Sequence, residues 1–396
     1  MSDLAQKIKS LSEQFFEEIK GIRRHLHSNP ELSFEEHNTA AFIEEKLAAF
    51  GIQNVERIAT TGVTFCLNGK EIGKTIALRA DIDALPILEE NEIPYRSKSD
   101  GVMHACGHDA HTASLLGAAK ILRETRNEWD GTIKFIFQPA EEKSPGGASI
   151  LIKEGILENP QPETILGQHV MPLIDAGKVG FRKGKYMASA DEVYLTIKGK
   201  GGHAAMPENF VDPIAITSQI IVSLQQIVSR FANPKMPTVL SFGKISGGTV
   251  TNIIPAEVKV EGTFRTFDEE WRKEALNKIR KIATGIAESM GATCEVHFAQ
   301  GYPFLKNHEA YTERNIKAAK DYLGEANVEE LDLWMAAEDF ASYSQHVDAC
   351  FYRLGTRNEQ EGITSGVHTS TFDIDEGSLK IGMGLMAYLA VNELSS

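Results

Sequence analysis

The sequence predicts a two-domain α/β protein in which a mostly parallel sheet, covered by helices on both faces, is interrupted by a smaller α+β domain. Three observations support this fold class. Near-continuous apolar strands that alternate with helical patterns are typical of parallel sheets buried on both sides. In the middle of the chain the order becomes strand–helix–strand–strand–helix–strand, as in a ferredoxin-like unit with an antiparallel sheet. The length of 396 residues also exceeds the ~250–300 at which single cores stop growing.

The larger domain is expected in two segments, 1–187 and 301–396, that form one discontinuous unit. Short apolar runs predict strands, and amphipathic patterns predict helices. The expected elements are an N-terminal helix within 1–27, strands at 75–80, 132–137 and 164–170, helices at 111–124, 147–156, 307–323 and 378–395, and an apolar run at 348–356.

The smaller domain is expected at 188–300, between hinges near 185–190 and 299–303. Its pattern differs from that of the flanking segments because two strands follow one another without a helix between them. The expected elements are strands at 191–200, 238–247, 257–267 and 294–299, and helices at 211–232 and 268–290.

Composition excludes several classes of function. The net charge is −14 and no long basic run is present, which argues against a nucleic-acid ligand. The N-terminal segment carries charges throughout and lacks the apolar core of a signal peptide. No stretch approaches the ~20 apolar residues that span a bilayer, so we expect a cytoplasmic protein without membrane contact. Its four cysteines have no short pair spacing, which is a poor disulfide framework.

The stretch "MHACGHDAH" at 103–111 raises the question of a metal site. Cys106 and His108 lie two residues apart and could ligate one ion or two adjacent ions. Alone, the pair is also compatible with a helix-capping loop that merely contains both residues. Other polar residues along the chain strengthen the metal hypothesis.

Glu141 and Glu142 directly follow the predicted strand 132–137, and His169 lies at the end of the strand 164–170. His368 lies in a glycine-flanked loop before the last helix. In open α/β sheets, ligands gather outside the carboxyl ends of the strands. Taken singly, the glutamates could form a solvated acidic turn, and each histidine could be a structural residue. Jointly, one cysteine, one glutamate and three histidines supply five ligands.

Five ligands exceed the three of a typical mononuclear catalytic zinc site, so two divalent ions that share a bridging water are more economical. Zinc suits thiolate and imidazole ligands, while the carboxylate keeps manganese and cobalt open. One of Glu141 and Glu142 can bind metal while the other serves as the base that amide hydrolysis requires. Asp81 and Asp83 follow another strand and could orient a ligand imidazole, or could be turn residues.

The ordered motifs resemble the aminoacylase and glutamate-carboxypeptidase family of dinuclear metallopeptidases. The similarity is greatest to its amidohydrolase branch, which includes hippuricase, auxin-conjugate hydrolases and N-acetyl-amino-acid deacetylases. It covers nearly the whole chain through "RRHLHSNPELSFEE", "LRADIDALPI", "MHACGHDAHTA", "FQPAEE", "GQHV", "GGHAAMP", "TNIIP", "GTFRTF", "AAEDFA" and "HTSTFDIDE".

The resemblance implies roles for individual residues. Those that match metal ligands are Cys106, His108, Glu142, His169 and His368. Glu141 matches the general base, and Asp81 matches an orienting aspartate. His203 matches a histidine that stabilises the oxyanion in the site of a partner subunit, although it could also be a solvated histidine. Asn252 and Arg265 resemble residues that hold the substrate carboxylate. The inserted domain then corresponds to a lid that forms a homodimer.

These observations predict a hydrolase that cleaves the amide bond of N-acyl amino acids with two divalent metal ions. A dipeptidase or carboxypeptidase is a close alternative, because the same centre cleaves any amide next to a carboxylate-bearing leaving group. A thiol amidase that uses Cys106, with His108 or His111 as its base, is a second alternative. A metal-binding protein without catalysis is a third, but it has no need of Glu141 beside the ligands.

Overall fold

A computed structural model describes residues 3–395 of the chain; residues 1, 2 and 396, which the predicted larger domain includes, lie outside the described residues. The chain divides into two compact units. The first unit runs to Gly184 and includes Lys306–Asp332 and the segment that begins at Asp339, whereas the second contains Lys185–Leu305 and Leu333–Glu338. The predicted boundaries place the short segment 333–338 in the larger domain, but its contacts assign it to the second unit.

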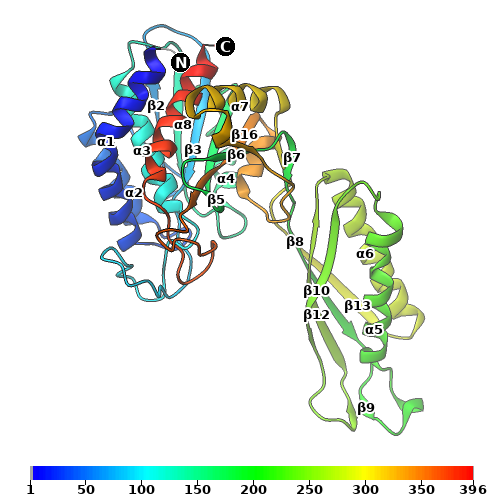
Figure 1. The fold of residues 1–396 in the computed structure, drawn as a ribbon. Coiled ribbons are helices and arrows are strands. Elements are labelled where there is room, and N and C mark those ends of the chain that lie inside the picture. Colours follow the sequence, from blue (N-terminus) through cyan, green and yellow to red (C-terminus); the bar gives the residue numbers. More distant parts are fainter. Residues whose placement is uncertain (1–2, 396) are drawn as a thin grey trace. The chain divides into compact units, whose positions relative to one another are not determined.

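An eight-stranded sheet forms the centre of the first unit (Figure 1). Its strands are β1 (Glu56–Ile58), β2 (Gly62–Asn68), β3 (Thr75–Asp81), β4 (Thr132–Gln138), β5 (Thr164–Asp175), β6 (Val179–Phe181), β15 (Val328–Glu330) and β16 (Asp348–Arg357). Their order is β1-β2-β4-β3-β5-β16-β6-β15. The four central strands, β4, β3, β5 and β16, run parallel, while β2 and β6 are antiparallel to their inner neighbours. The mostly parallel sheet predicted from the sequence is therefore confirmed.

Helices cover both faces of this sheet. They are α1 (Asp3–Ser28), α2 (His37–Ala49), α3 (His108–Glu124), α4 (Gly147–Lys153), α7 (Glu309–Leu323) and α8 (Ser378–Leu394). Ile133, Phe135 and Phe137 of β4 point into the main core, which α3 and α8 share. Lys134, one residue out of phase, donates instead to the carbonyl of Ile156, which follows α4. Alternate residues of β4 thus face two helical layers.

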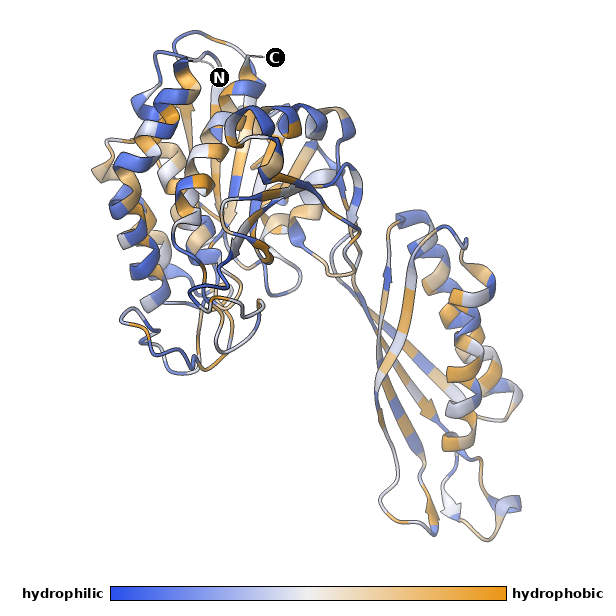
Figure 2. Ribbon diagram, in the orientation of Figure 1, coloured by the Kyte–Doolittle hydropathy of each residue, from blue (hydrophilic) through white to orange (hydrophobic). Residues whose placement is uncertain are grey.

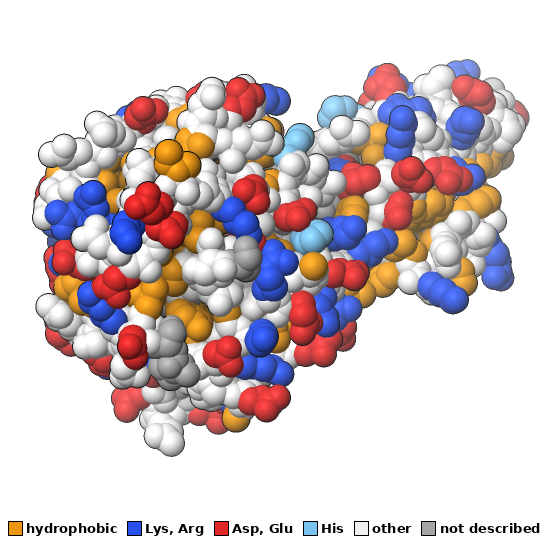
Figure 3. Space-filling view, turned by 90° about the horizontal axis from the view of Figure 1, so that it is seen from above, with side chains coloured by type: hydrophobic (Ala, Val, Ile, Leu, Met, Phe, Trp, Pro, Cys, Tyr) orange, Lys and Arg blue, Asp and Glu red, His pale blue; other side chains and the backbone are white. Residues whose placement is uncertain are grey.

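Helix α1 packs on α3 and α8 through apolar residues spaced three, four and seven apart. Hydrophilic and hydrophobic residues alternate along it, as Figure 2 shows. Its buried apolar residues include Ile8, Phe15, Ile19, Ile22 and Leu26. Figure 3 shows acidic and basic side chains interspersed on the visible face of the first unit. None of the helices within residues 3–395 combines the length and apolar character that a membrane crossing needs.

The second unit contains a four-stranded antiparallel sheet and two long helices. Its elements are β8 (Asp191–Lys198), α5 (Pro213–Leu224), β10 (Thr238–Ser246), β12 (Glu257–Thr266), α6 (Glu269–Ser289) and β13 (Thr293–Gln300), and the sheet order is β10-β12-β8-β13. This is the predicted strand–helix–strand–strand–helix–strand sequence of elements. Short strands β7 (Gly184–Met187) and β14 (Leu305–Asn307) lie where the chain passes between the units.

The helix predicted at 211–232 is shorter in the structure. Val211 pairs with Lys200 as a β-bridge, and the Asp212 side chain caps the helix that Pro213 begins. After Leu224 the chain continues into the π-helical turn η2 (Ile227–Phe231). Separate from the four-stranded sheet, β9 (Gly202–His203) and β11 (Ile253–Ile254) pair as a small antiparallel ribbon.

Candidate metal centre

The loop between β3 and α3 delivers the first two predicted ligands. Cys106 precedes α3 and His108 is its first residue, with Gly107 between them. Gly107 has φ +81°, and a Cβ there would lie 2.5 Å from Val170 Cγ2. Only glycine tolerates this left-handed backbone so close to β5. The turn therefore depends on the "CGH" sequence and brings the two side chains to the same side.

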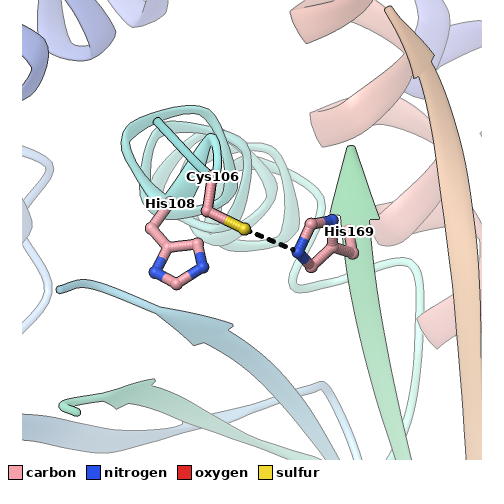
Figure 4. A group of neighbouring side chains, drawn as sticks. All are labelled: Cys106, His108 and His169. Carbon is pink, nitrogen blue, oxygen red and sulfur yellow. Dashed lines mark hydrogen bonds between the residues drawn. The ribbon is translucent and has the colours of Figure 1, made fainter. Parts of the chain in front are cut away.

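The Cys106 sulfur lies at the centre of the cluster. Its Sγ is 3.4 Å from His169 Nε2 and 3.3 Å from His368 Nε2. Figure 4 shows the Cys106 sulfur pointing toward His169 of β5, with His108 beside Cys106. His169 lies in the middle of β5, because this strand continues to Asp175, beyond the end predicted at residue 170. His169 Nδ1 lies 2.7 Å from the Val170 carbonyl oxygen, to which it donates. This bond fixes the tautomer, so that the lone pair of His169 Nε2 faces the sulfur.

The five predicted ligands form two groups that share Cys106. One group is Cys106, His108 and His169, and the other is Cys106, Glu142 and His368. Within each group the candidate ligand atoms lie within 4.8 Å of one another. Catalytic zinc sites hold their ion with three protein ligands and leave a position for water or substrate. The arrangement therefore fits two adjacent cations with one shared thiolate.

Two buried polar atoms in this cluster support a cation at the site. Among the described residues, His108 Nε2 and Glu142 Oε1 are buried without a hydrogen-bond partner, and a neighbour of Glu142 Oε1 is His368 Nε2, another proposed ligand atom, at 3.2 Å. Burying such an atom unpaired costs about 1–3 kcal/mol. Both atoms are of the kind that ligates divalent metals, so coordination would satisfy them. The donor set of thiolate, imidazole and carboxylate thus fits zinc, and also manganese or cobalt.

Asp83 organises the cluster from behind the ligands. Its Oδ1 accepts a hydrogen bond from the Glu141 backbone N–H at 3.0 Å, and its Oδ2 accepts one from the Glu142 backbone N–H at 3.0 Å. His108 Nδ1 lies 3.2 Å from Asp83 Oδ1, which leaves His108 Nε2 turned toward the cluster. Ser33 Oγ also donates to Asp83 Oδ2, at 2.6 Å. One carboxylate thus fixes three residues of the site.

Asp81 makes different contacts from those of Asp83. Its Oδ1 is 2.5 Å from His111 Nδ1, and its Oδ2 accepts from Arg79 at 2.6 Å. His111 Nε2 in turn accepts a hydrogen bond from the Val170 backbone N–H at 2.8 Å. The distance from Asp81 Oδ1 to His108 Nε2 is 3.9 Å. Asp81 therefore orients His111, a histidine that the sequence motif contains but that is absent from the predicted ligand set.

The protonation states of the ligands follow from burial and neighbouring carboxylates. Burial and the nearby Glu142 and Glu141 raise the pKa of the Cys106 thiol well above its usual range. Burial opposes the charged form of His108, but Asp81 and Asp83 outweigh it and raise its pKa to about 10. Cations would compete with these protons, because a ligand must be deprotonated to bind.

Glu141 lies beside the ligands. Candidate ligand atoms of His108, Glu141 and Glu142 all lie within 4.8 Å of one another. The Glu141 residue is only 6% exposed, and its Oε1 accepts from the Asp339 backbone N–H at 3.4 Å. A carboxylate so placed can exchange a proton with a water molecule held in the cluster.

The remaining predicted residues belong to the second unit. His203 and Asn252 are neighbours in the β9–β11 ribbon, where the Ala204 N–H donates to the Asn252 carbonyl at 3.1 Å. Arg265 lies near the other end of β12, and its guanidinium donates to the Met335 carbonyl at 3.3 Å. Arg265 lies eight positions after Glu257, the first residue of β12 and the one nearer the ribbon in the chain. Eight positions along a strand span about 27 Å. Within the second unit, Arg265 is therefore far from the other two.

A thiol, imidazoles and carboxylates gathered at the carboxyl edge of a mostly parallel α/β sheet define a metal-dependent hydrolase. The chain belongs to peptidase family M20/M25/M40, whose model matches residues 77–392. Membership of this family makes the chain a hydrolase of amide bonds.

Similar proteins cover most of the chain. An N-acyl-L-amino acid amidohydrolase of Geobacillus stearothermophilus is 43% identical over 304 residues, which are 77% of this chain and 82% of the relative. Thermostable carboxypeptidase 2 of Saccharolobus solfataricus is 38% identical over 392 residues, 98% of each chain. The crystal structure of YXEP from Bacillus subtilis, a dinuclear metal-binding peptidase of family M20, is 36% identical with a TM-score of 0.83 and covers 97% of this chain and 99% of that one.

Proposed function

We propose that this enzyme hydrolyses the amide bond of N-acyl amino acids with two divalent cations and with Glu141 as general base. The observation that carries the proposal is the shared position of Cys106 in two groups of three ligands. A relative that is 43% identical is named an N-acyl-L-amino acid amidohydrolase, which supports the substrate class.

The chain offers complementary ligands to the two cations. His108 and His169 would hold one ion, Glu142 and His368 would hold the other, and Cys106 would bridge them. Zinc is the metal that thiolate and imidazole favour, with manganese and cobalt as the other candidates. When bound, such cations would polarise an amide carbonyl and lower the pKa of a bound water molecule.

Glu141 is the proton carrier in this proposal. Its buried carboxylate takes a proton from the attacking water and later passes it to the departing amine, so that a carboxylic acid and a free amino acid result. Asp83 holds the backbone of Glu141 and Glu142 and the ring of His108, and thus fixes base and ligands relative to one another. Asp81 acts through His111, which bonds the backbone next to His169.

We propose that the second unit supplies the contacts to the substrate. Arg265 would bind the substrate carboxylate with its planar guanidinium. The ribbon that contains His203 and Asn252 precedes Glu257, which is itself about 27 Å of strand away from Arg265, so we assign these two residues to the substrate in the site of a partner subunit. There His203 would stabilise the negative charge that develops on the amide oxygen.

A homodimer through the second unit is part of this proposal. Strand β10 is an edge of the four-stranded sheet, and within the described residues its outer side pairs with no other strand. Ile245 on β10 and Val222 on α5 are 59% and 69% exposed. Ile214, Ile221 and Val258 help to line a hollow of about 400 Å³ between these elements. An unpaired edge beside exposed apolar residues favours pairing with a second copy.

We propose that the enzyme acts in the cytoplasm, as the sequence predicts.

Carboxypeptidase or dipeptidase action is the second candidate. A relative that is 38% identical over 98% of the chain is named a carboxypeptidase, and the same ligands would serve a peptide bond. A thiol amidase is less well supported. Cys106 is only 6% exposed, and burial among carboxylates raises its pKa, so its thiol is a poor nucleophile without a bound cation.

A substrate panel on metal-free enzyme, restored with zinc, manganese or cobalt, tests the proposal. We expect restored hydrolysis, with N-acetyl and N-benzoyl amino acids turned over faster than unblocked dipeptides. The variant Glu141→Gln should keep the metal content of the wild type and lose activity by orders of magnitude. Equal activity in this variant would refute the role of Glu141, and activity without metal would favour the thiol amidase.

A further inference from the structure

A second cluster of charged side chains is buried in the first unit and contains none of the proposed ligands. We call it the Arg23 cluster, and it consists of Arg23, His27, Glu89, Asp109, Asp373 and Glu376. Arg23 and Asp109 are fully buried. The cluster joins helix α1 to three segments that are distant in the sequence.

Arg23 uses the separate N–H groups of its guanidinium for separate partners. Nε donates to Asp109 Oδ2 at 2.7 Å, and Nη2 donates to Asp373 Oδ1 at 2.8 Å. Nη1 lies 3.5 Å from Glu376 Oε1. The planar guanidinium therefore fixes the direction from Asp109 to Asp373, which a lysine ammonium could not do.

His27 lies one helical turn after Arg23 and strengthens the hold on Asp109. Its Nδ1 is 2.8 Å from Asp109 Oδ2, and its Nε2 is 3.2 Å from Glu89 Oε1. Glu89 in turn accepts from the Ser97 backbone N–H at 2.7 Å. The segment between β3 and α3 is thereby tied to the same helix.

Both arms of Arg23 end next to proposed ligands. Asp109 directly follows His108 and lies three residues after Cys106. Asp373 lies five residues after His368, in the segment between β16 and α8 that has no regular secondary structure. His368 has φ +62°, an uncommon conformation for this residue type, and its side chain is 52% exposed. Its backbone N–H donates to the Ala105 carbonyl at 2.7 Å, next to Cys106, and the rest of its position depends on contacts made elsewhere in the segment.

We propose that Arg23 is a positioning residue that fixes the His368 segment against the Cys106 turn, and so sets the spacing of the ligand group Cys106, Glu142 and His368. This inference rests on the proposed function, since it assumes those ligands. The alternative is that the Arg23 cluster only stabilises the fold, and that the ligands find the same positions without it.

The two readings differ in what they predict for metal binding by folded protein. Arg23→Lys keeps the charge but loses the fork, and Asp373→Asn weakens one arm at a residue that is not fully buried. Arg24→Gln is the matched control, because Arg24 also bonds Glu376 but touches neither Asp109 nor Asp373. Urea unfolding and near-UV circular dichroism of the metal-free proteins report whether each variant is folded.

Titration of the metal-free full chain with Co²⁺ and Zn²⁺ against a chromophoric chelator measures both binding steps. We expect one of the two cations to bind about 10- to 100-fold more weakly in Arg23→Lys and Asp373→Asn, with the other step unchanged. Arg24→Gln should match the wild type in both steps.

Wild-type affinity for both cations in the folded variants would overturn the proposal, as would equal weakening in Arg24→Gln. Variants that are partly unfolded while their folded fraction binds both cations normally would also overturn it, in favour of a purely structural role. Failure of the proposed function gives a different result, because the wild type itself would then not bind two cations.

Discussion

Replacing Asp83 by asparagine tests whether one carboxylate organises the site. The substitution keeps the shape of the side chain but turns one acceptor oxygen into an NH₂ donor. If Oδ1 is retained, the Glu142 backbone N–H faces the new NH₂ group and loses its partner. The bonds from Glu141 N–H and His108 to Oδ1 persist without their charge.

The size of the effect follows from these contacts. An unpaired buried N–H costs about 1–3 kcal/mol, and each bond that becomes neutral loses about 0.5–1.5 kcal/mol. The sum over one unpaired N–H and two neutral bonds is about 2–6 kcal/mol, shared between the free energy of unfolding and the free energy of metal binding. Loss of a group that orients a metal ligand weakens metal affinity or activity about 10- to 100-fold, which is about 1.4–2.7 kcal/mol.

The assay compares Asp83→Asn with Ser33→Ala, in which Asp83 keeps its charge and loses only the hydroxyl bond. Chelator competition gives the metal affinity, kcat/KM gives the transition-state effect, and urea unfolding gives the stability. We expect Asp83→Asn to lose 10- to 100-fold in metal affinity and at least as much in kcat/KM. Ser33→Ala should lose about 1 kcal/mol of stability and less than twofold in affinity. Metal affinity and kcat/KM within twofold of wild type in Asp83→Asn would refute the reasoning.

Three further predictions concern protons, acid and assembly. At pH 8, metal binding should release about two protons, one from Cys106 and one from His108, whose pKa is about 10. Metal binding by Cys106→Ser should release about one proton. Calorimetry in buffers of different ionisation enthalpy measures the number of protons released, and no release would contradict the assigned pKa directions. Burial disfavours the charged form of Asp109, but Arg23 and His27 outweigh burial and hold the pKa of this carboxyl far below its usual range. The ionised carboxylate therefore stabilises the fold above the unfolded-state pKa of about 3.9, and this stabilisation is lost as the pH falls from this value toward the folded-state pKa. Metal-free Asp109→Asn should therefore be less stable at pH 7 and lose less stability than the wild type between pH 5 and pH 3, and parallel urea-midpoint curves would contradict this. Ile245→Lys on β10 should shift sedimentation toward the monomer, whereas Thr293→Lys on the opposite edge strand β13 should not. A wild-type protein that itself sediments as a monomer would contradict the proposed dimer.

Much of the fold could be predicted because buried parallel strands are apolar over their whole length. The predicted strand 75–80 differs from β3 by a single residue. The first and last residues of a helix are harder to predict where polar residues are buried. Helix α3 begins at His108, three residues before the predicted start, because His108 and Asp109 have the character of loop residues in the sequence but are fully buried in the structure.

The proximity of the five proposed ligands could be predicted because strand ends and the loops that follow them meet at one edge of a parallel sheet, while their role as ligands stays a prediction. The residues alone could not decide between Asp81 and Asp83, since both follow the same predicted strand, and the resemblance favoured Asp81 as the orienting aspartate. Asp81 still belongs to β3 and contacts Arg79 and His111, whereas Asp83 lies beyond the strand and reaches the loop after β4.

The motif "RRHLHSNPELSFEE", which contains Arg23 and His27, supports the family resemblance but does not indicate a buried cluster of charges. Arg23 and Arg24 together resemble the charged face of an amphipathic helix, yet only Arg24 faces solvent. Burial of Arg23 depends on acidic partners more than 80 residues away in the chain, which no local pattern reveals. From their motifs, Arg265 and Asn252 were both expected to hold one carboxylate. Their separation follows from the length of β12, which no single motif reveals.

The central claim is that Cys106 is a thiolate shared by two cations. Titrating metal-free protein with Co²⁺ tests it most directly, because bound cobalt reports its number of equivalents and its sulfur ligand in the absorption spectrum. We predict an end point of two ions per chain, with a thiolate-to-cobalt absorption band that Cys106→Ser abolishes. An end point of one ion or none, or two ions without any thiolate band, would contradict it.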